Sequence, residues 1–221
     1  MLSLTHVYAD LRGLTDTVRE FAAAVREGKR ILLLAGPSDG AVAIARRAGG
    51  LLSPMTEAEA SHVSTVQDAA GIRPSGRRPF RAPHHTCSWA GMFGGTRTSV
   101  NDEGFTFKRQ TVGEVGLARF GVLFLDEVTE FRRDLVAMVG VVMFGTLIVR
   151  ALPCPCGMAN HPTRKCTCTE QQQDRWAKRL GRIVADLDIE AIIEVPHLTN
   201  DERAYGTRCP STADLHEVYS E

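Results

Sequence analysis

The sequence predicts an α/β fold with a parallel sheet, on three observations. Two short apolar runs, Ile31–Ala35 and Val122–Leu125, have the composition of strands that are buried on both faces. Segments in which apolar residues recur at helical spacing lie between the expected strands. The first run leads through Gly36-Pro37 into such a segment, and the second ends at Asp126-Glu127, so each run has a clear carboxyl end.

The other elements follow from local signals in chain order. Apolar residues at helical spacing over 14–25, followed by Gly28, predict a first helix. Thr56 precedes acidic residues and marks the start of another helix. A turn sequence between two extended pieces predicts a hairpin over 99–111. We also expect helices at 41–48, from Arg132 onward and at 171–180, a loop at 73–83, a strand at 189–195 and a loose polar tail at 197–221.

Composition excludes some classes of protein. The chain has 221 residues, of which 43% are hydrophobic, enough to bury a core. Its formal net charge is +0, so it has no overall positive charge that would attract nucleic acid. Its most apolar stretch, 135–149, is shorter than the roughly 20 residues of a membrane-spanning helix. We expect that stretch to be a buried helix that runs into a buried strand. With no signal-peptide pattern at the start, we expect a cytoplasmic protein without membrane contact.

The first strand and the helix after it outline a phosphate-binding loop. In a parallel sheet, strand ends and helix N-termini meet at one edge, where backbone N–H groups favour an anion. We expect the loop to bind the phosphates of a nucleotide through Gly36, Pro37, Gly40, Ala41 and Val42.

The second strand places two carboxylates at the same edge. In a nucleoside triphosphatase, Asp126 would hold Mg²⁺ through water, and Glu127 would be the catalytic residue that polarises the attacking water. Any strand can end in acids, but the strand–Gly-Pro–helix unit earlier in the chain strengthens the interpretation.

A cysteine-rich loop, CPCGMANHPTRKCTC, indicates a structural metal site. Its two Cys-x-Cys pairs, Cys154 with Cys156 and Cys166 with Cys168, supply the four thiolates that bind Zn²⁺ tetrahedrally, although Cys-x₂-Cys is the commoner spacing. Four free buried thiols are the alternative, and His161 is a substitute ligand. Cys87 and Cys209 are isolated and read as ordinary small residues.

Two segments carry cations that suit an interaction surface. RRPFRAPHHT contains Arg78, Arg81, His84 and His85, and the hairpin interleaves aromatic residues with Lys108 and Arg109. Such patterns suit contact with DNA, an acidic partner or a neighbouring subunit. A proline-fixed loop with solvated arginines, and a solvated hairpin with one apolar face, are the alternatives.

Taken together, the motifs resemble the magnesium-chelatase-like AAA+ ATPases, most of all their competence-type helicase branch. The resemblance rests on RPFRAPHHT (78–86), GEVGLARFGVLFLDEVTEF (113–131) and PCPCG (153–157), with support from YADLRG (8–13) and IIEVP (192–196). It implies an AAA+ P-loop NTPase-like three-layer core over 1–196, which includes the metal loop 153–169, followed by the tail. It also implies ATP with Mg²⁺, assembly into homomeric or mixed rings, and work on DNA.

Several residues that the family uses are replaced. The family's loop reads GPPGSGKT, whereas GPSDGAVA at 36–43 lacks the Lys that offsets phosphate charge and the hydroxyl that ligates Mg²⁺. Asp39 adds a negative charge there. Leu152 stands where the family has an Asn, and ADLDIE at 185–190 lacks the Arg of the family's DRID. The tail replaces the helical lid. We expect ATP hydrolysis to be impaired.

Three hypotheses follow. The chain is a degenerate AAA+ module that binds nucleotide weakly or joins a ring without hydrolysis. Alternatively, it is a non-enzymatic, zinc-stabilised module that binds DNA or a protein partner. The third possibility is a decaying gene fragment with no selected activity.

Overall fold

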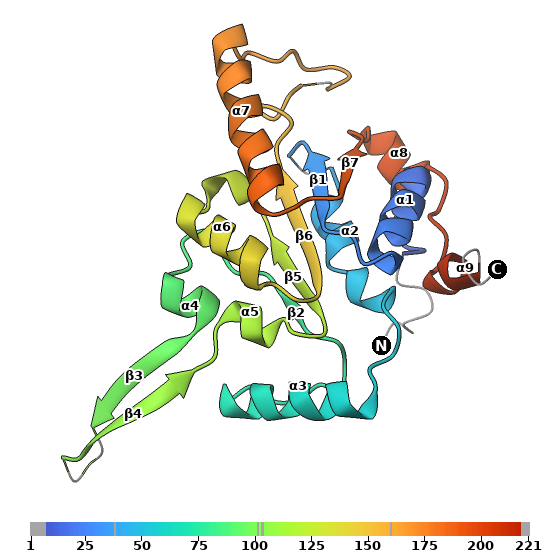
Figure 1. The fold of residues 1–221 in the computed structure, drawn as a ribbon. Coiled ribbons are helices and arrows are strands. Elements are labelled where there is room, and N and C mark those ends of the chain that lie inside the picture. Colours follow the sequence, from blue (N-terminus) through green and yellow to red (C-terminus); the bar gives the residue numbers. More distant parts are fainter. Residues whose placement is uncertain (1–7, 38, 101, 103, 160, 218–221) are drawn as a thin grey trace.

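The computed structural model describes residues 8–37, 39–100, 102, 104–159 and 161–217. Its main sheet has five parallel strands in the order β2-β5-β6-β1-β7, and β3 and β4 form a separate antiparallel hairpin (Figure 1). The elements are α1 (Thr15–Arg26), β1 (Ile31–Ala35), α2 (Ala41–Ala45), the 3₁₀ turn η2 (Ala48–Gly50), α3 (Glu57–Ala69), β2 (Phe80–Arg81), α4 (Trp89–Phe93), β3 (Gly95–Val100), β4 (Thr106–Thr111), α5 (Glu114–Leu117), β5 (Val122–Leu125), the 3₁₀ turn η3 (Val128–Glu130), α6 (Arg133–Val142), β6 (Thr146–Ala151), α7 (Glu170–Asp186), β7 (Ala191–Val195), α8 (Asn200–Tyr205) and α9 (Thr212–Glu217).

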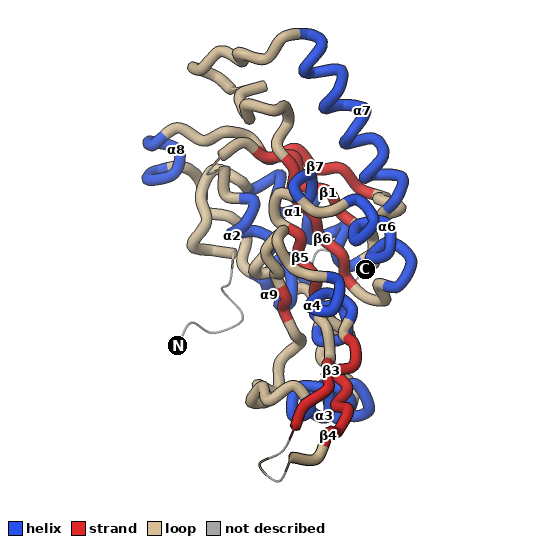
Figure 2. Tube along the Cα trace, turned by 90° about the vertical axis from the view of Figure 1, so that its left-hand side faces the viewer, coloured by secondary structure: helices blue, strands red, loops and turns tan. Residues whose placement is uncertain are grey.

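Helices cover both faces of the sheet, which gives three layers (Figures 1 and 2). Because successive strand residues point to opposite faces, Leu33 and Phe124 pack in the core beneath α1 and α2. Leu32 and Leu123 lie in a second core beneath α6 and α7. β1 and β5 are apolar throughout because both of their faces are buried. The predicted three-layer α/β fold with a parallel sheet is therefore confirmed.

Most predicted elements are present. β1 and β5 have the predicted bounds, and the hairpin forms, with β3 beginning earlier than expected. Thr56 begins α3 through a capping box, in which its side chain accepts from the Glu59 N–H and the Glu59 carboxylate accepts from the Thr56 N–H. The apolar stretch 135–149 divides into α6 and β6 as predicted, α2 is shorter than predicted and α7 is longer. No helix among the described residues is long and apolar enough to span a bilayer.

One strand was missed inside the expected loop 73–83. Phe80 and Arg81 form β2 and pair in parallel with Val122 and Leu123 of β5. Pro79 accepts a hydrogen bond from the Val122 N–H at 2.8 Å, and the Phe80 ring packs 6.2 Å from that of Phe124. A strand of two residues is too short to show any periodicity in the sequence.

The interpretation of 197–221 as a loose tail is wrong for 197–217, the part that the structure describes. Leu198, Cys209 and Leu215 are buried in the core that also contains α1. The Cys209 N–H donates to the Leu11 carbonyl at 2.9 Å, and Arg26 of α1 donates to the Leu215 carbonyl at 3.0 Å. A few apolar residues in a polar segment are enough to anchor it.

A single arginine ties α6 and α7 to the start of β1. Arg30 donates through Nη1 to the carbonyls of Gly140 and Leu187, each at 2.9 Å, and through Nη2 to that of Met143 at 3.4 Å. These carbonyls lie at helix C-termini, where no intrahelical donor is left for them. The two helices approach closely here, because a Cβ added at Gly140 would lie 2.0 Å from the Asp186 carbonyl oxygen.

This close approach makes Gly140 a required glycine. We predict that Gly140→Ala lowers the free energy of unfolding by about 1–3 kcal/mol, because the backbones of α6 and α7 must separate. Gly181→Ala is the control, since a Cβ there meets nothing within 4 Å. It should raise stability by about 0.5–1 kcal/mol through the helical preference of alanine. Urea denaturation of both variants measures the difference, and equal stabilities would contradict the packing argument.

Candidate functional site

The sheet brings the expected phosphate loop and the acidic strand end to one edge. β1 ends at Ala35 and β5 at Leu125, and the two parallel strands are separated by β6 alone. Gly40 begins α2 with φ of 88°, in the left-handed region that favours glycine. Ser38 lies outside the described residues. The expected order of strand, Gly36-Pro37 and helix is therefore present, and phosphate binding there stays a prediction.

Asp39 turns its carboxylate into the protein. Its side chain is only 4% exposed, and Oδ1 accepts a hydrogen bond from Nδ1 of His197 at 2.7 Å, with Nη2 of Arg203 at 3.9 Å. Its other oxygen lies so near Gly36 that an added Cβ would be 2.5 Å away. The His197 ring stacks on that of His161, with centroids 3.8 Å apart. The loop thus encloses a carboxylate of its own, which opposes a bound phosphate by like-charge repulsion.

The carboxylates after β5 are paired with a cation from β6. Arg150 donates through Nε to Oδ1 of Asp126, and its Nη2 lies 3.7 Å from Oε1 of Glu127. The same Asp126 oxygen accepts from the Glu127 backbone N–H at 2.9 Å. The Arg150 side chain is 10% exposed. A protein guanidinium therefore lies against the two groups expected to serve Mg²⁺ and the attacking water.

An open cavity of about 410 Å³ adjoins the loop. Gly40, Ala41 and Val42 line it on one side. Three guanidinium groups line it as well, from Arg46, Arg47 and Arg150. Arg47 is anchored by Asp10, with Nη2 to Oδ2 at 2.6 Å. The cavity thus offers positive charge to an anion without the missing lysine.

The four cysteines of the predicted metal loop converge. Their sulfurs all lie within 4.8 Å of one another. Cys154 lies 3.4 Å from Cys156 and 3.7 Å from Cys166, sulfur to sulfur, and Cys156 lies 3.6 Å from Cys166. Four sulfurs at about 2.3 Å from one zinc ion would be about 3.8 Å apart. The spacing fits a tetrahedral metal site, for which Cys168 would supply the fourth ligand.

Backbone donors favour the thiolate at Cys156, whereas burial raises the pKa of Cys168. The N–H groups of Thr167 and Met158 lower the pKa of Cys156 to about 5. The Ala159 N–H donates to the Cys154 sulfur at 3.2 Å, while burial raises the pKa of that thiol. His161 does not belong to the cluster, because its Nδ1 accepts from the Arg164 N–H at 3.0 Å within the same loop. The four thiols, without the histidine, can hold a metal ion.

The family model of magnesium chelatase, subunit ChlI, matches residues 8–141 and 142–203. The chain belongs to this family. The family resemblance predicted from the motifs is confirmed, and the match continues past Pro196 into α8.

Curated relatives show the same relationship over part of their length. The competence protein ComM of Haemophilus influenzae is 36% identical over 125 residues, which are 55% of this chain and 22% of that protein. Protein YifB of Escherichia coli is 32% identical over 58% of this chain and 24% of its own length. Protein Mb2921c of Mycobacterium bovis is 31% identical over 76% of this chain and 35% of its own length. The chain thus spans about a quarter to a third of these relatives.

Among solved structures, NtrX from Brucella abortus matches with a TM-score of 0.46 at 15% identity, over 82% of this chain and 36% of that one. NtrX in complex with ATP matches with a TM-score of 0.44 at 17% identity, over 85% of this chain and 36% of that one. Neither similarity carries an inference about activity.

The family motif RPFRAPHHT has a structural part and an exposed part. Arg78 donates to the carbonyls of Ser53 and Phe120, each at 2.6 Å. Arg81 donates to both carboxylate oxygens of Glu114, at 2.6 and 2.7 Å. Neither guanidinium is therefore free for a partner.

The other predicted interaction residues lie on two segments, the loop before α4 and the strand β4. His84 is exposed, and its ring stacks on that of the half-buried His85, with centroids 4.0 Å apart. Lys108 and Arg109 lie on β4, where Arg109 donates to the Ala69 carbonyl of α3 at 3.2 Å. The side chain of Phe107 lies outside the described residues.

Two features were missed at the sequence level. Arg150 lies just after the apolar stretch 135–149 and carried no prediction, because nothing local marks it as the partner of Asp126. The second is a row of cations on α7: Arg175, Lys178, Arg179 and Arg182. Their spacing of three and four residues places them on one helix face, and this signal was available in the sequence.

The ion pair of Arg81 with Glu114 should contribute more to the free energy of unfolding than an exposed Arg–carboxylate pair does. We predict that Arg81→Lys, which loses the two-pronged contact with Glu114, lowers the free energy of unfolding by about 1–2 kcal/mol. Arg132→Lys is the matched control, because the side chains of Arg132 and Asp134 are 66% and 53% exposed. It should cost under about 0.5 kcal/mol. Chemical denaturation compares them, and a control as costly as Arg81→Lys would contradict the assignment.

Proposed function

We propose that the chain is an AAA+ module of the magnesium chelatase family that binds ATP weakly and does not hydrolyse it. The contact of Arg150 with Asp126 and Glu127 carries the proposal. To coordinate Mg²⁺ at Asp126, the ion would have to displace a guanidinium that is almost fully buried. The residues that would stabilise the transferring phosphoryl group are also replaced.

What remains of the site suits a phosphate without a metal ion. The cavity beside Gly40 is lined by Arg46, which supplies positive charge in place of the lysine. The backbone N–H groups at Gly40 and Ala41 add donors. Asp39 weakens this attraction, because it lies in the same lining. We therefore propose weak, Mg²⁺-independent binding of the phosphates.

We propose a structural Zn²⁺ ion at the four cysteines. Zinc prefers thiolates at tetrahedral spacing, and four protein ligands leave no open position for chemistry. The loop ends directly at α7, whose N-cap residue is Thr169, and Nε2 of Gln173 on that helix lies 3.5 Å from the Cys166 sulfur. The ion would fix the start of α7.

A module without turnover would act through its contacts. Subunits of a homomeric or mixed ring are the partners we propose first, in keeping with the family. A DNA- or protein-binding role is the second candidate, and the exposed cations of α7 favour it. We propose the cytoplasm as the compartment, where thiols stay reduced and available to zinc.

ATPase assays and thermal shifts test the nucleotide proposal. We predict no ATP turnover by the metal-replete chain, and a small stabilisation by ATP or ADP that does not change when Mg²⁺ is added. Arg150→Met should make the stabilisation Mg²⁺-dependent, because Asp126 is then free to hold the ion. Arg132→Met, an exposed arginine, is the control. Turnover that disappears in Glu127→Gln would overturn the proposal.

Metal removal tests the zinc proposal. We predict one zinc ion per chain by elemental analysis, and Cys156→Ser should lower this content. Chelation and Cys156→Ser should both speed amide hydrogen exchange in the first turns of α7 while the sheet stays protected. Cys87→Ser is the control, because that isolated thiol should change neither readout. Full zinc content in Cys156→Ser would contradict the assignment.

A further inference from the structure

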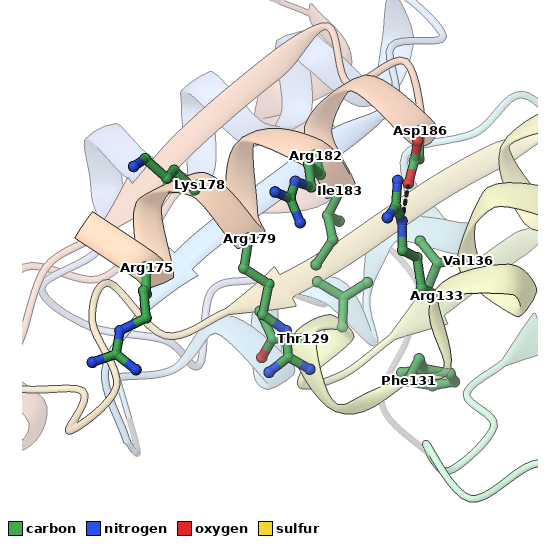
Figure 3. Close-up of a pocket in the computed structure, with 11 residues that line it drawn as sticks. Thr129, Phe131, Arg133, Val136, Arg175, Lys178, Arg179, Arg182, Ile183 and Asp186 are labelled. Carbon is green, nitrogen blue, oxygen red and sulfur yellow. Dashed lines mark ion pairs between the residues drawn. The ribbon is translucent and has the colours of Figure 1, made fainter. Parts of the chain in front are cut away.

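A cavity of about 480 Å³, which we call the α6–α7 cavity, lies between α7 and the segment η3–α6 (Figure 3). Its floor is apolar and consists of Val128, Phe131, Val136 and Ile183, all of which are buried. In Figure 3 the Ile183 side chain points from α7 toward the opposite wall. The volume is in the range of sites that bind a small molecule. The floor suits the apolar part of such a ligand.

The α6–α7 cavity differs from the cavity beside Gly40, although the two approach each other along the chain. Val128 and Thr129, which line the α6–α7 cavity, directly follow Asp126-Glu127. The cavity beside Gly40 is lined by residues 39–43, 46, 47 and 150, so the two share no lining residue among those described. A ligand of the α6–α7 cavity therefore meets different side chains from those expected to hold the phosphates of a nucleotide.

The rim of the α6–α7 cavity is cationic. Arg175, Lys178, Arg179 and Arg182 of α7 line it, and all four are exposed. Their spacing of three and four residues places like charges beside one another on one helix face, which is unfavourable. Within the described part of the chain, the side chains of Lys178, Arg179 and Arg182 make no hydrogen bond or ion pair. Their charges are therefore available to a ligand.

The acids of the cavity walls leave this rim positive. Asp186 is the carboxylate in the lining, and Nε of Arg133, which also lines the cavity, lies 3.8 Å from it. The other acids of η3, α6 and α7 do not line the cavity: Glu130, Asp134, Glu170 and Asp174. Guanidinium groups bind carboxylates and phosphates through paired hydrogen bonds. The rim thus favours an anionic group, next to a floor that favours an apolar one.

We propose that the α6–α7 cavity binds a small amphipathic anion. Its apolar body covers the floor, and its carboxylate or phosphate lies against Arg179 and Arg182 at the rim. In Figure 3 the Arg179 side chain extends from α7 toward the wall that contains Thr129. A guanidinium thus lies beside the apolar floor, where one ligand can meet both. The anion also lowers the repulsion among the cations of α7. The site is additional to the proposed function and does not depend on it.

Anilinonaphthalene sulfonate, a fluorescent anion with an apolar ring system, tests the proposal on the full chain. We expect saturable binding of one probe per chain. Naphthylacetate and naphthyl phosphate should displace the probe, and the stronger of the two identifies the preferred anionic group. The neutral naphthylacetamide should displace it about tenfold more weakly, because it offers no charge to the rim. Added salt should weaken displacement by the two anions and leave that by the amide unchanged.

Variants locate the bound probe. Arg179→Gln combined with Arg182→Gln should weaken probe binding by about tenfold or more, because the rim loses two guanidinium groups while glutamine preserves the helix. Ile183→Phe should weaken binding of the probe and of the neutral amide alike, because the ring occupies the floor. Arg73→Gln is the control, since it alters an exposed arginine outside the lining. Circular dichroism establishes that each variant is folded.

ATP separates this site from the nucleotide site. ATP should leave the bound probe in place, while its thermal shift on the wild-type chain reports the nucleotide site independently. Probe displacement by ATP would overturn the proposal, because the cavity would then belong to the nucleotide site. Binding that does not saturate, equal displacement by the anions and the amide, or unchanged affinity in the double variant of Arg179 and Arg182 would each overturn it as well.

Discussion

The arrangement of the candidate nucleotide site depends on one buried charge. Arg150 lies on β6, with strands on both sides and helices over both faces, and a guanidinium in that position needs a counter-charge. Asp126 and Glu127 supply it from the end of the neighbouring strand. The two carboxylates that the family resemblance expects to serve Mg²⁺ and water are thus ion-paired within the protein itself. Asp39 of the loop, which the family motif does not contain, is likewise paired inside the protein, with His197.

The sequence was informative where the signal was local. Continuous apolar runs predicted β1 and β5, and the Cys-x-Cys pairs predicted a cluster that forms within one loop. It failed where the partner is distant or the element is short. Arg150 and Asp126 are 24 positions apart, and Asp39 and His197 are 158 apart, so only the sheet order brings them together. β2 has two residues, and 197–217 is held by a few apolar anchors that no periodic pattern reveals.

The cations divide in a similar way. Arg78 and Arg81 belong to the family motif RPFRAPHHT, yet they hold the loop before β5 in place through carbonyl and carboxylate contacts. The cations of α7 have no such internal partners among the described residues, apart from the Arg175 contact with its own helix. A conspicuous motif therefore marks a structural role here, while an inconspicuous helix carries the charges that face solvent. The two roles differ in whether the side chain already has a hydrogen-bond or ionic partner inside the protein. A sequence pattern does not show this.

Arg30 has a consequence for how the α6–α7 cavity accepts an occupant. Its guanidinium joins the C-terminal carbonyls of both helices that form the cavity walls, so the walls cannot separate without breaking these hydrogen bonds. The cavity is preorganised, and little wall motion has to be frozen when it is filled. Encounter rates would then be set by the charge of the rim and by ionic strength, whereas residence time would depend on how well the apolar floor is covered.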